Sequence, residues 1–304
     1  MITWGPYICK KTLGKGGYAT VKLAQHSETG NECALKILRR KNQSESVTEA
    51  VENEVAVMKE LDHQGIIKIL DFSDDAEYTL PNGRSMEVYY IAIELASNGE
   101  IFDVLAETGR FSEPLARHYF HQLVESIEHM HSKGVFHRDI KPENIMLDSN
   151  FDLKVADFGF SSHDTTCSIR KGTTSYMAPE MHLQDKFKTA PLDIFAAGLI
   201  LFIMLKAAPA FNEARLTDTH YKLLISKPAL FWKVHFKKFG NEQPSEEIKE
   251  LITKMLEFDP EQRITLENIK NCDWYNGPVP SKEDIIAELT LRKIQMSEDQ
   301  EMEG

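Results

Sequence analysis

The hydrophobic pattern divides the chain into a strand-rich first third and a helix-rich remainder. Alternating or β-branched runs predict five strands in the first third, at 7–11, 20–25, 32–38, 66–72 and 88–95. Residues 45–61 carry apolar side chains at helical spacing and predict one helix among these strands. The run Pro81-Asn82-Gly83 predicts a hairpin turn between the last two strands. We therefore expect a small α+β unit at the start of the chain.

Helical signals dominate the remainder. Ser112 can cap a helix that ends at Gly134. Residues 192–205 are apolar on nearly every side, which predicts a buried central helix, and this run is too short to cross a bilayer. Further helices are expected near 245–258 and 265–271.

The last stretch, 281–304, begins as an amphipathic helix and becomes acidic and frayed toward its end. Ile285 and Leu289 share one side of this helix, and such residues need a surface on which to be buried. Two interpretations stay open: the helix packs on the body of the protein, or the stretch is a disordered remnant of a longer regulatory segment.

A glycine cluster, Gly14-Lys15-Gly16-Gly17, lies between the first two expected strands. Glycines let the backbone bend tightly and bring N–H groups close to phosphate oxygens. An ordinary hairpin turn explains the cluster equally well, whereas a dinucleotide-binding fold is excluded because a strand rather than a helix follows.

Lys36 lies inside an apolar strand, where a lysine usually extends its ammonium group to the surface. Glu54 on the following helix can form an ion pair that would hold Lys36 toward bound phosphates, and Glu52 is the competing partner.

Three further motifs follow in order, His137-Arg138-Asp139-Ile140-Lys141-Pro142-Glu143-Asn144, Asp157-Phe158-Gly159 and Ala178-Pro179-Glu180. Together with the glycine cluster and Lys36, they resemble the signature set of eukaryotic protein kinases. The resemblance covers 7–275 and includes Asp193, which would support the catalytic loop, and Arg263, which would pair with Glu180. It implies an α+β bilobal protein-kinase fold, with an N-lobe at 7–96, a C-lobe at 97–275 and an extension at 276–304.

Among kinases, the chain is most similar to the calcium/calmodulin-dependent group, including its ciliate members. The long hairpin before residue 95 and the run Tyr221-Lys222-Leu223-Leu224, followed by Phe231-Trp232, carry this finer resemblance.

The resemblance implies ATP and Mg²⁺ as cofactors and transfer of the γ-phosphate to serine or threonine. The catalytic residues would be Asp139, Lys141, Asn144, Lys36 and Glu54. Asp139 would orient the substrate hydroxyl, Lys141 would stabilise charge on the γ-phosphate, and Asn144 with Asp157 would hold the metal. Lys141 together with Thr173 argues for serine/threonine rather than tyrosine specificity.

The same resemblance places a set of residues at the nucleotide-binding site. They are Leu13, Gly14, Lys15, Gly16, Gly17, Val21, Ala34, Lys36, Ile93, Glu94, Ala96, Glu100, Glu143, Met146 and Asp157. A buried stack of four side chains would link the lobes, namely Met58, Ile69, His137 and Phe158.

Protein substrates are the expected partners, with arginine three residues before the target. Glu100 and Glu143 match the two acids that bind this arginine in basic-directed relatives. Lys222 stands where some relatives have a further acid, so selectivity two residues before the target should be weak. Ile169 stands where related kinases carry a phosphorylated threonine, so we expect activity without loop phosphorylation, with Ser168 or Thr166 as a secondary site.

Charge and cysteine content narrow the partners and the compartment. The chain has 35 basic and 47 acidic residues and a formal net charge of -12, which disfavours nucleic acid and membrane as partners. The charge suits a cationic partner, or it only keeps the protein in solution. Four widely spaced cysteines and the lack of signal-peptide features at the first residues predict free thiols and a cytoplasmic protein, which we expect to be a monomer.

Two other functions compete with the kinase interpretation. A pseudokinase would keep the fold without the chemistry, but such proteins typically lack one of the residues found here as Lys36, Asp139 and Asp157. A small-molecule kinase would not need the Ala-Pro-Glu segment, which resembles a peptide-docking platform.

Overall fold

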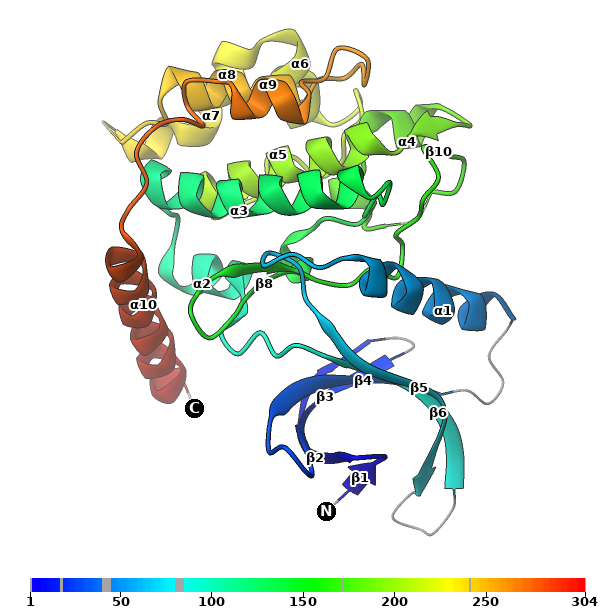
Figure 1. The fold of residues 1–304 in the computed structure, drawn as a ribbon. Helices are drawn as coiled ribbons and strands as arrows, with labels where there is room; N and C mark the ends of the chain where they lie inside the picture. The colour runs from blue at the N-terminus through cyan, green and yellow to red at the C-terminus, as the bar shows by residue number, and fades with distance from the viewer. Residues whose placement is uncertain are drawn as a thin grey trace.

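The computed structural model describes residues 2–16, 19–39, 45–79, 85–170, 172–240 and 242–303 of the chain. They form a small lobe of β-sheet with one helix and a larger, mainly helical lobe (Figure 1). The expected bilobal α+β fold is confirmed. Gly17 and the expected turn at Pro81-Asn82-Gly83 lie outside the described residues.

The small lobe is built on a six-stranded antiparallel sheet in the order β1-β2-β3-β4-β6-β5. Its elements are β1 (Ile2–Trp4), β2 (Tyr7–Lys15), β3 (Ala19–His26), β4 (Glu32–Arg39), α1 (Glu45–Glu60), β5 (Ile69–Thr79) and β6 (Ser85–Ile93). Helix α1 buries Val51 and Val55 against Leu38 and Ile91 of the sheet. This apolar contact is what its helical spacing predicted.

Strand β5 differs from the expectation at both ends. The predicted strand at 66–72 begins later, at Ile69, and continues to Thr79 through the exposed residues Asp74 and Asp75. Strand β5 lies at the edge of the sheet, where one side faces water, so polar residues are tolerated there. Strand β1 was not expected.

A three-stranded sheet lies where the lobes meet, formed by β7 (Gly99–Glu100), β8 (Ile145–Leu147) and β9 (Leu153–Val155). The chain that leaves α1 is tied to this sheet, because Val155 N donates to Gly65 O at 2.8 Å and Ile67 N donates to Val155 O at 2.9 Å. Strand β9 therefore has a fixed place relative to the segment that enters β5 of the small lobe.

The large lobe surrounds α5 (Ala190–Lys206), whose residues from Leu192 to Leu205 are all buried, as its sequence predicted. The other helices and short strands are α2 (Ile101–Thr108), α3 (Glu113–Ser132), β10 (Thr166–Cys167), α4 (Pro179–Leu183), β11 (Phe187–Lys188), α6 (Thr219–Ser226), α7 (Pro228–Phe236), α8 (Glu246–Met255) and α9 (Leu266–Lys270). The predictions of α3, α8 and α9 are confirmed, and Ser112 caps α3 by accepting a hydrogen bond from Leu115 N. No helix among the described residues has the length and apolar character needed to span a membrane.

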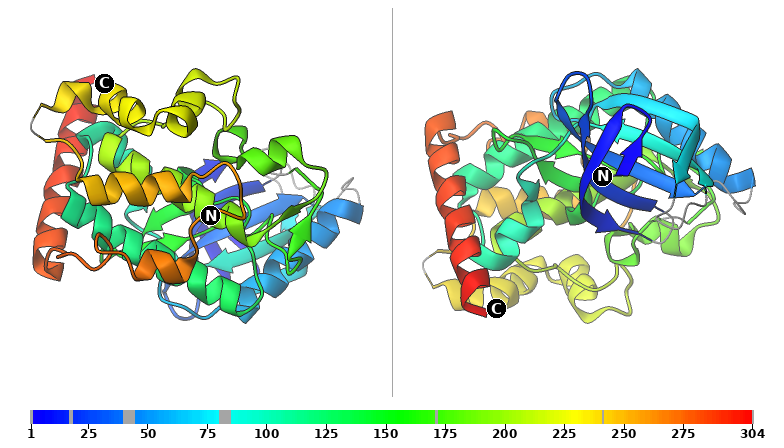
Figure 2. Two further views of the ribbon diagram at one scale, coloured as in Figure 1. Left: turned by 90° about the horizontal axis from the view of Figure 1, so that it is seen from above. Right: turned by 90° about the horizontal axis from the view of Figure 1, so that it is seen from below.

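Helix α10 (Lys282–Glu303) lies along one side of the molecule, next to α2 (Figures 1 and 2). Ile285 and Leu289 are buried against the large lobe. Of the two interpretations of this stretch, the structure shows the packed helix.

Candidate active site

Lys36 on β4 lies between two carboxylates. Its Nζ is 2.6 Å from Glu54 Oε1 on α1 and 3.3 Å from Asp157 Oδ1. Glu54 rather than Glu52 is therefore its partner, because Glu54 lies on the buried side of α1 and Glu52 on the exposed side. One ammonium group thus connects the sheet, α1 and the motif at 157–159.

The pKa values of Lys36 and Asp157 favour their charged forms, whereas burial outweighs Lys36 at Glu54 and raises the pKa of that carboxyl. Burial lowers the pKa of Lys36, but the carboxylates of Glu54 and Asp157 outweigh burial and leave the pKa raised. Burial raises the pKa of Asp157, and Lys36 outweighs it, so that this pKa is lowered. Because the Asp157 side chain is 49% exposed, its carboxylate remains accessible to a ligand.

The catalytic loop brings Asp139 against three partners. Lys141 Nζ donates to Asp139 Oδ2 at 2.7 Å, and Thr173 N donates to Asp139 Oδ1 at 3.2 Å. Asn144 Nδ2 donates to the Asp139 backbone oxygen at 2.9 Å. The Asn144 amide is thereby oriented with its nitrogen toward Asp139, which leaves its oxygen as the available ligand atom.

Asp193 at the start of α5 anchors this loop through its carboxylate. Its fully buried carboxylate accepts hydrogen bonds from His137 N at 3.0 Å and Arg138 N at 2.8 Å, and it contacts His131 Nε2 at 2.8 Å. Arg138 and Asp157 both have positive φ, of 65° and 62°, a conformation that non-glycine residues adopt only when their surroundings impose it. The Asp193 hydrogen bonds supply that constraint for Arg138.

The buried stack between the lobes is present. Met58, His137 and Phe158 are buried, and Ile69 packs against the same core. The rings of His137 and Phe158 meet edge to face, with centroids 5.0 Å apart. With Phe158 inside the core, Asp157 faces Lys36.

The two described glycines with open surroundings in the cluster are Gly14 and Gly16. A Cβ atom on Gly14 would meet nothing within 4 Å, and on Gly16 it would meet only Ala19 O at 3.7 Å. Packing within the described part of the protein therefore does not require glycine at either place. Leu13, next to Gly14, is 44% exposed.

Residues 7–275 match the family model described as the protein kinase domain. The chain belongs to the protein kinase family. Curated relatives include CBL-interacting serine/threonine-protein kinase 8 of Arabidopsis thaliana, 34% identical over 89% of this chain and 58% of the relative. CBL-interacting protein kinase 11 of Oryza sativa subsp. japonica is 32% identical over 91% of this chain and 53% of the relative. The chain thus spans little more than half the length of these relatives.

Several residues predicted to contact the nucleotide lie on neighbouring strands. Ala34 pairs with Ile93 across β4 and β6, and Val21 pairs with Lys36 across β3 and β4. Met146 lies on β8 of the sheet between the lobes, paired with Glu100 on β7. The N–H of Ala96, just after β6, has no hydrogen-bond partner among the described residues and is available to a ligand.

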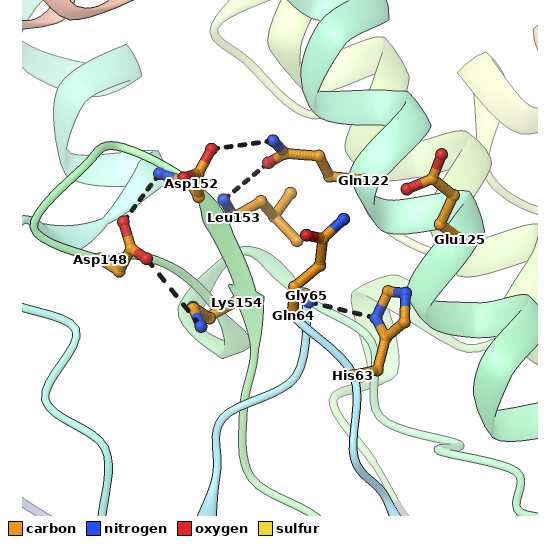
Figure 3. A pocket seen from close by; sticks show the side chains of 9 residues that line it. All are labelled: His63, Gln64, Gly65, Gln122, Glu125, Asp148, Asp152, Leu153 and Lys154. Carbon is orange, nitrogen blue, oxygen red and sulfur yellow. Dashed lines mark hydrogen bonds and ion pairs between the residues drawn. The ribbon is translucent and has the colours of Figure 1, made fainter.

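Sequence reasoning missed the ion pair that anchors the hinge, by which we mean residues 94–98 between β6 and β7. Lys154 Nζ lies 2.7 Å from Glu94 Oε1 and 3.9 Å from Asp148 Oδ2. Lys154 also lines a polar cavity of about 120 Å³ between α3 and the β8–β9 turn, where Gln122 bonds both Asp152 and the Leu153 amide (Figure 3). This cavity is separate from the charged cluster around Lys36. A lysine alternating with apolar residues in β9 was the available signal.

Arg263 secures the segment after the activation loop. It donates to both carboxylate oxygens of Glu180, at 2.7 and 2.8 Å, and the two side chains are almost fully buried. Such a two-pronged, desolvated contact is geometrically specific. It fixes the start of α4, where Glu180 lies.

The Arg138 guanidinium makes its hydrogen bonds to the protein itself. Its Nε donates to Phe160 O at 2.7 Å, and its Nη1 donates to Cys167 Sγ at 2.9 Å. Cys167 is buried on β10, and Ile169, two residues later, is 56% exposed. The arginine that often binds a phosphorylated loop residue here binds the loop directly.

Glu100 and Glu143 lie close enough to interact. Burial raises the pKa of Glu100 to about 7, with smaller contributions from Asp103 and Glu143. Glu143 is exposed and Glu100 is half-buried. Two acids that repel each other form a place where a cation would be favoured.

Proposed function

We propose that this chain is an active protein kinase that transfers the γ-phosphate of ATP to serine or threonine in other proteins. The observation that carries the proposal is the assembled contact of Lys36 with both Glu54 and Asp157, at 2.6 and 3.3 Å. A pseudokinase typically loses one of these groups. The relatives that are named serine/threonine-protein kinases support the same activity.

Each residue has one task in this mechanism. Lys36, held by Glu54, binds the α- and β-phosphates, and the Gly14–Gly16 backbone covers them. Asp139 accepts the proton of the substrate hydroxyl. At the same time the hydroxyl oxygen bonds to the γ-phosphorus, and the bond between the γ-phosphorus and the β-phosphate oxygen breaks. Lys141 neutralises the charge on the transferred group. Protein kinases generally use Mg²⁺, and when bound here it would supply positive charge that offsets the charge of the phosphates.

The donor set suits Mg²⁺. The free carboxylate of Asp157 and the amide oxygen of Asn144 are hard oxygen ligands, the type that Mg²⁺ prefers. Nucleotide contacts would come from the remaining predicted residues, namely Leu13, Lys15, Val21, Ala34, Ile93, Glu94, Ala96 and Met146. The N-lobe at 7–96 and the C-lobe at 97–275 would close on the nucleotide from either side.

Serine/threonine specificity rests on Thr173 and Lys141. Lys141 Nζ lies 3.2 Å from Thr173 Oγ1 and 2.7 Å from Asp139 Oδ2, so the three groups form one network at the expected phosphoacceptor position. Glu100 and Glu143 would bind an arginine three residues before the target, because a planar guanidinium can bond to two converging carboxylates.

The finer assignments also belong to this proposal. We place the chain near the calcium/calmodulin-dependent kinases and their ciliate members, on the sequence resemblance stated above. A reducing, cytoplasmic setting and a monomeric state suit its four unpaired cysteines.

Phosphorylation with labelled ATP tests the proposal. Wild-type protein should label a serine or threonine peptide in Mg²⁺ and leave the matched tyrosine peptide unlabelled. Asp157→Asn should lower kcat about a hundredfold or more, while the melting temperature changes little because this side chain is half exposed. Lys36→Met should also abolish transfer, and Asp273→Asn, which changes an exposed side chain just after α9, serves as the control. Near-normal turnover of Asp157→Asn would refute the metal role.

A further inference from the structure

The segment 219–239, which forms α6, α7 and the following turn, is basic in an acidic protein. It contains five lysines and no aspartate or glutamate, whereas the whole chain has a formal net charge of -12. All five lysines are exposed, and none forms an ion pair within the part of the chain that the structure describes. The positive charge here also affects Lys206. Burial lowers the pKa of Lys206, and the nearby charges of Lys238 and Arg110 lower it further.

Helix α7 also exposes apolar side chains. Its inner side buries Phe231, Trp232 and Phe236 in the large lobe, and Phe202 of α5 lies against them. Its outer side leaves Leu230 43% and Val234 48% exposed. These two residues are four positions apart, so they are neighbours on the helix surface.

Three of the lysines surround this apolar pair. With 3.6 residues per turn, Lys227, Leu230, Lys233, Val234 and Lys237 fall within about a third of the helix circumference. We call these five residues the α7 face. It combines an apolar centre with a cationic rim, and among the described residues none forms an ion pair with these three lysines.

We propose that the α7 face is a docking site for an acidic segment of protein substrates, one that carries two apolar residues a helical turn apart. The proposal rests on the proposed kinase activity and adds to it a contact away from the phosphorylated residue. The choice of occupant follows from charge complementarity: carboxylates match the three lysines, and two apolar side chains match Leu230 and Val234.

The position of α7 explains how such a contact would act. Helix α7 lies at the end of the large lobe far from the small lobe (Figure 1), whereas Glu100 belongs to β7, in the three-stranded sheet where the lobes meet. A substrate that has arginine near its target residue and an acidic segment elsewhere would therefore bind at two places of opposite charge. Tethering the two contacts raises the effective concentration of the target at the active site and lowers KM.

An anionic membrane is the other candidate for a basic patch. The rest of this protein is strongly acidic, and its repulsion from an anionic surface opposes attachment through one short helix. A short acidic segment contacts only the α7 face and avoids that repulsion.

Binding of a synthetic peptide tests the site directly. The probe is a fluorescein-labelled helical peptide with two leucines four residues apart among glutamates. Its fluorescence anisotropy should report saturable binding to the full chain, weakened by added salt because exposed charges are screened. Lys233→Glu with Lys237→Glu should weaken binding about tenfold, and so should Leu230→Ser with Val234→Ser.

Matched controls come from elsewhere on the large lobe and the adjoining linker. Lys133→Glu reverses an exposed, unpaired lysine, and Val279→Ser removes a valine that is 43% exposed. Neither should alter peptide binding. Melting temperatures of all variants confirm that each is folded, and both pairs of α7 substitutions change exposed side chains only.

The catalytic arm uses a basic phosphoacceptor peptide with and without the acidic segment fused through a flexible linker. Fusion should lower KM at least fivefold for wild type and not for Lys233→Glu with Lys237→Glu, while kcat on the unfused peptide stays the same in both. Failure of the unfused peptide to react would count against the proposed kinase activity. The anisotropy measurement would still test the docking site, because it does not depend on phosphorylation. Equal probe binding by wild type and both α7 variants would overturn the docking site. Stronger, α7-dependent binding to phosphatidylserine vesicles than to the probe would overturn the choice of a protein partner.

Discussion

Glu100 is the residue whose environment most changes its expected behaviour. An exposed glutamate is fully ionised at neutral pH, but burial, Asp103 and Glu143 raise the pKa of Glu100 to about 7. The charge that would attract a substrate arginine is therefore only partly present in the free enzyme at pH 7. Arginine itself stays charged over the whole accessible range.

Arginine selectivity should consequently grow as the pH rises. Between pH 6 and pH 8, the ionised fraction of a group with a pKa of about 7 increases from about a tenth to about nine tenths. The ratio of kcat/KM for a peptide with arginine three residues before the target to that of its alanine counterpart should rise several-fold over this range. Because kcat/KM reports the free enzyme and the ratio cancels shared catalytic groups, the change isolates Glu100.

Glu100→Gln provides the control for this measurement. Its glutamine cannot ionise, so the arginine-to-alanine ratio should be lower than in wild type at pH 8 and nearly independent of pH. A wild-type ratio that stays constant from pH 6 to pH 8 would contradict the role of Glu100.

At the scale of elements, the activation segment holds itself in place through Arg138. The guanidinium donates hydrogen bonds to Phe160 O and Cys167 Sγ, and β10 pairs with β11, which follows α4 in the chain. No phosphate is needed to satisfy this arginine. Protein treated with a phosphatase should retain most of its kcat, with complete dephosphorylation verified by intact mass.

A second measurement distinguishes the role of the loop contact. Ser168→Ala and Thr166→Ala should change kcat less than twofold if these residues are only secondary sites. A phosphatase-treated protein that is wholly inactive would show that the Arg138 contacts are insufficient.

His235 on α7, which lies against His220 of α6, should make the protein sensitive to acid. His220 Nδ1 lies 3.0 Å from His235 Nε2, and burial, His220 and Lys206 lower the pKa of His235 from 6.5 to about 4. Above pH 6.5 His235 is neutral in both states, so its contribution to folding stability is fully present. Between pH 6.5 and pH 4 only the unfolded chain gains the proton, and stability falls by at most about 1.4 kcal/mol per pH unit.

Urea unfolding at pH 7.5 and pH 5 checks this contribution. The wild-type protein should lose more stability between the two pH values than His235→Gln, whose side chain does not titrate there. Equal losses for both proteins would mean that other groups account for the acid sensitivity.

The elements also show what the sequence could and could not predict. Helices α3, α5, α8 and α9 were predictable because their caps or apolar patterns are local signals, such as Ser112 and the apolar run of α5. Helix α2 was missed because it is short and Glu100 at its start makes no side-chain cap. Helix α6 did have a signal, since Asp218 accepts hydrogen bonds from His220 N and Tyr221 N.

The candidate active site was likewise predictable only in part. The order of motifs predicted which residues would act together, and the structure brings Lys36, Glu54 and Asp157 into contact. The contact of Lys154 with Glu94 joins residues far apart in sequence and depends on how β9 meets the hinge. No local pattern encodes that distance, so only the folded structure reveals it.

At the scale of the whole molecule, α10 joins the end of the chain to the hinge. Arg292 Nη1 donates to Thr108 Oγ1 at 2.9 Å and to Gly109 O at 3.1 Å, and its guanidinium lies 5.1 Å from the Phe111 ring centroid. Lys293 Nζ donates to Asn98 O at 3.1 Å. Both contacts satisfy carbonyl groups that flank α2.

Removing the Arg292 side chain should therefore loosen this end of the molecule. Arg292→Ala is expected to reduce stability by about 2 kcal/mol, because several charge-assisted hydrogen bonds are lost. Differential scanning fluorimetry should show a melting temperature lower by about 4 °C. Arg215→Ala, which removes an exposed arginine paired with Glu213, should leave the melting temperature unchanged, and an equal drop in both variants would argue against a special role for α10.

The buried side of α10 also bears on recombinant production of this kinase. The family match ends at Tyr275, which invites a shorter expression boundary there. Such a fragment would lack Ile285 and Leu289 and would expose the apolar surface that these side chains cover in the full chain. Newly exposed apolar surface promotes self-association, so the shorter fragment should yield less monodisperse protein than one that extends through α10. The boundary for a well-behaved sample is therefore set by where α10 stops packing, some distance beyond the end of the catalytic domain.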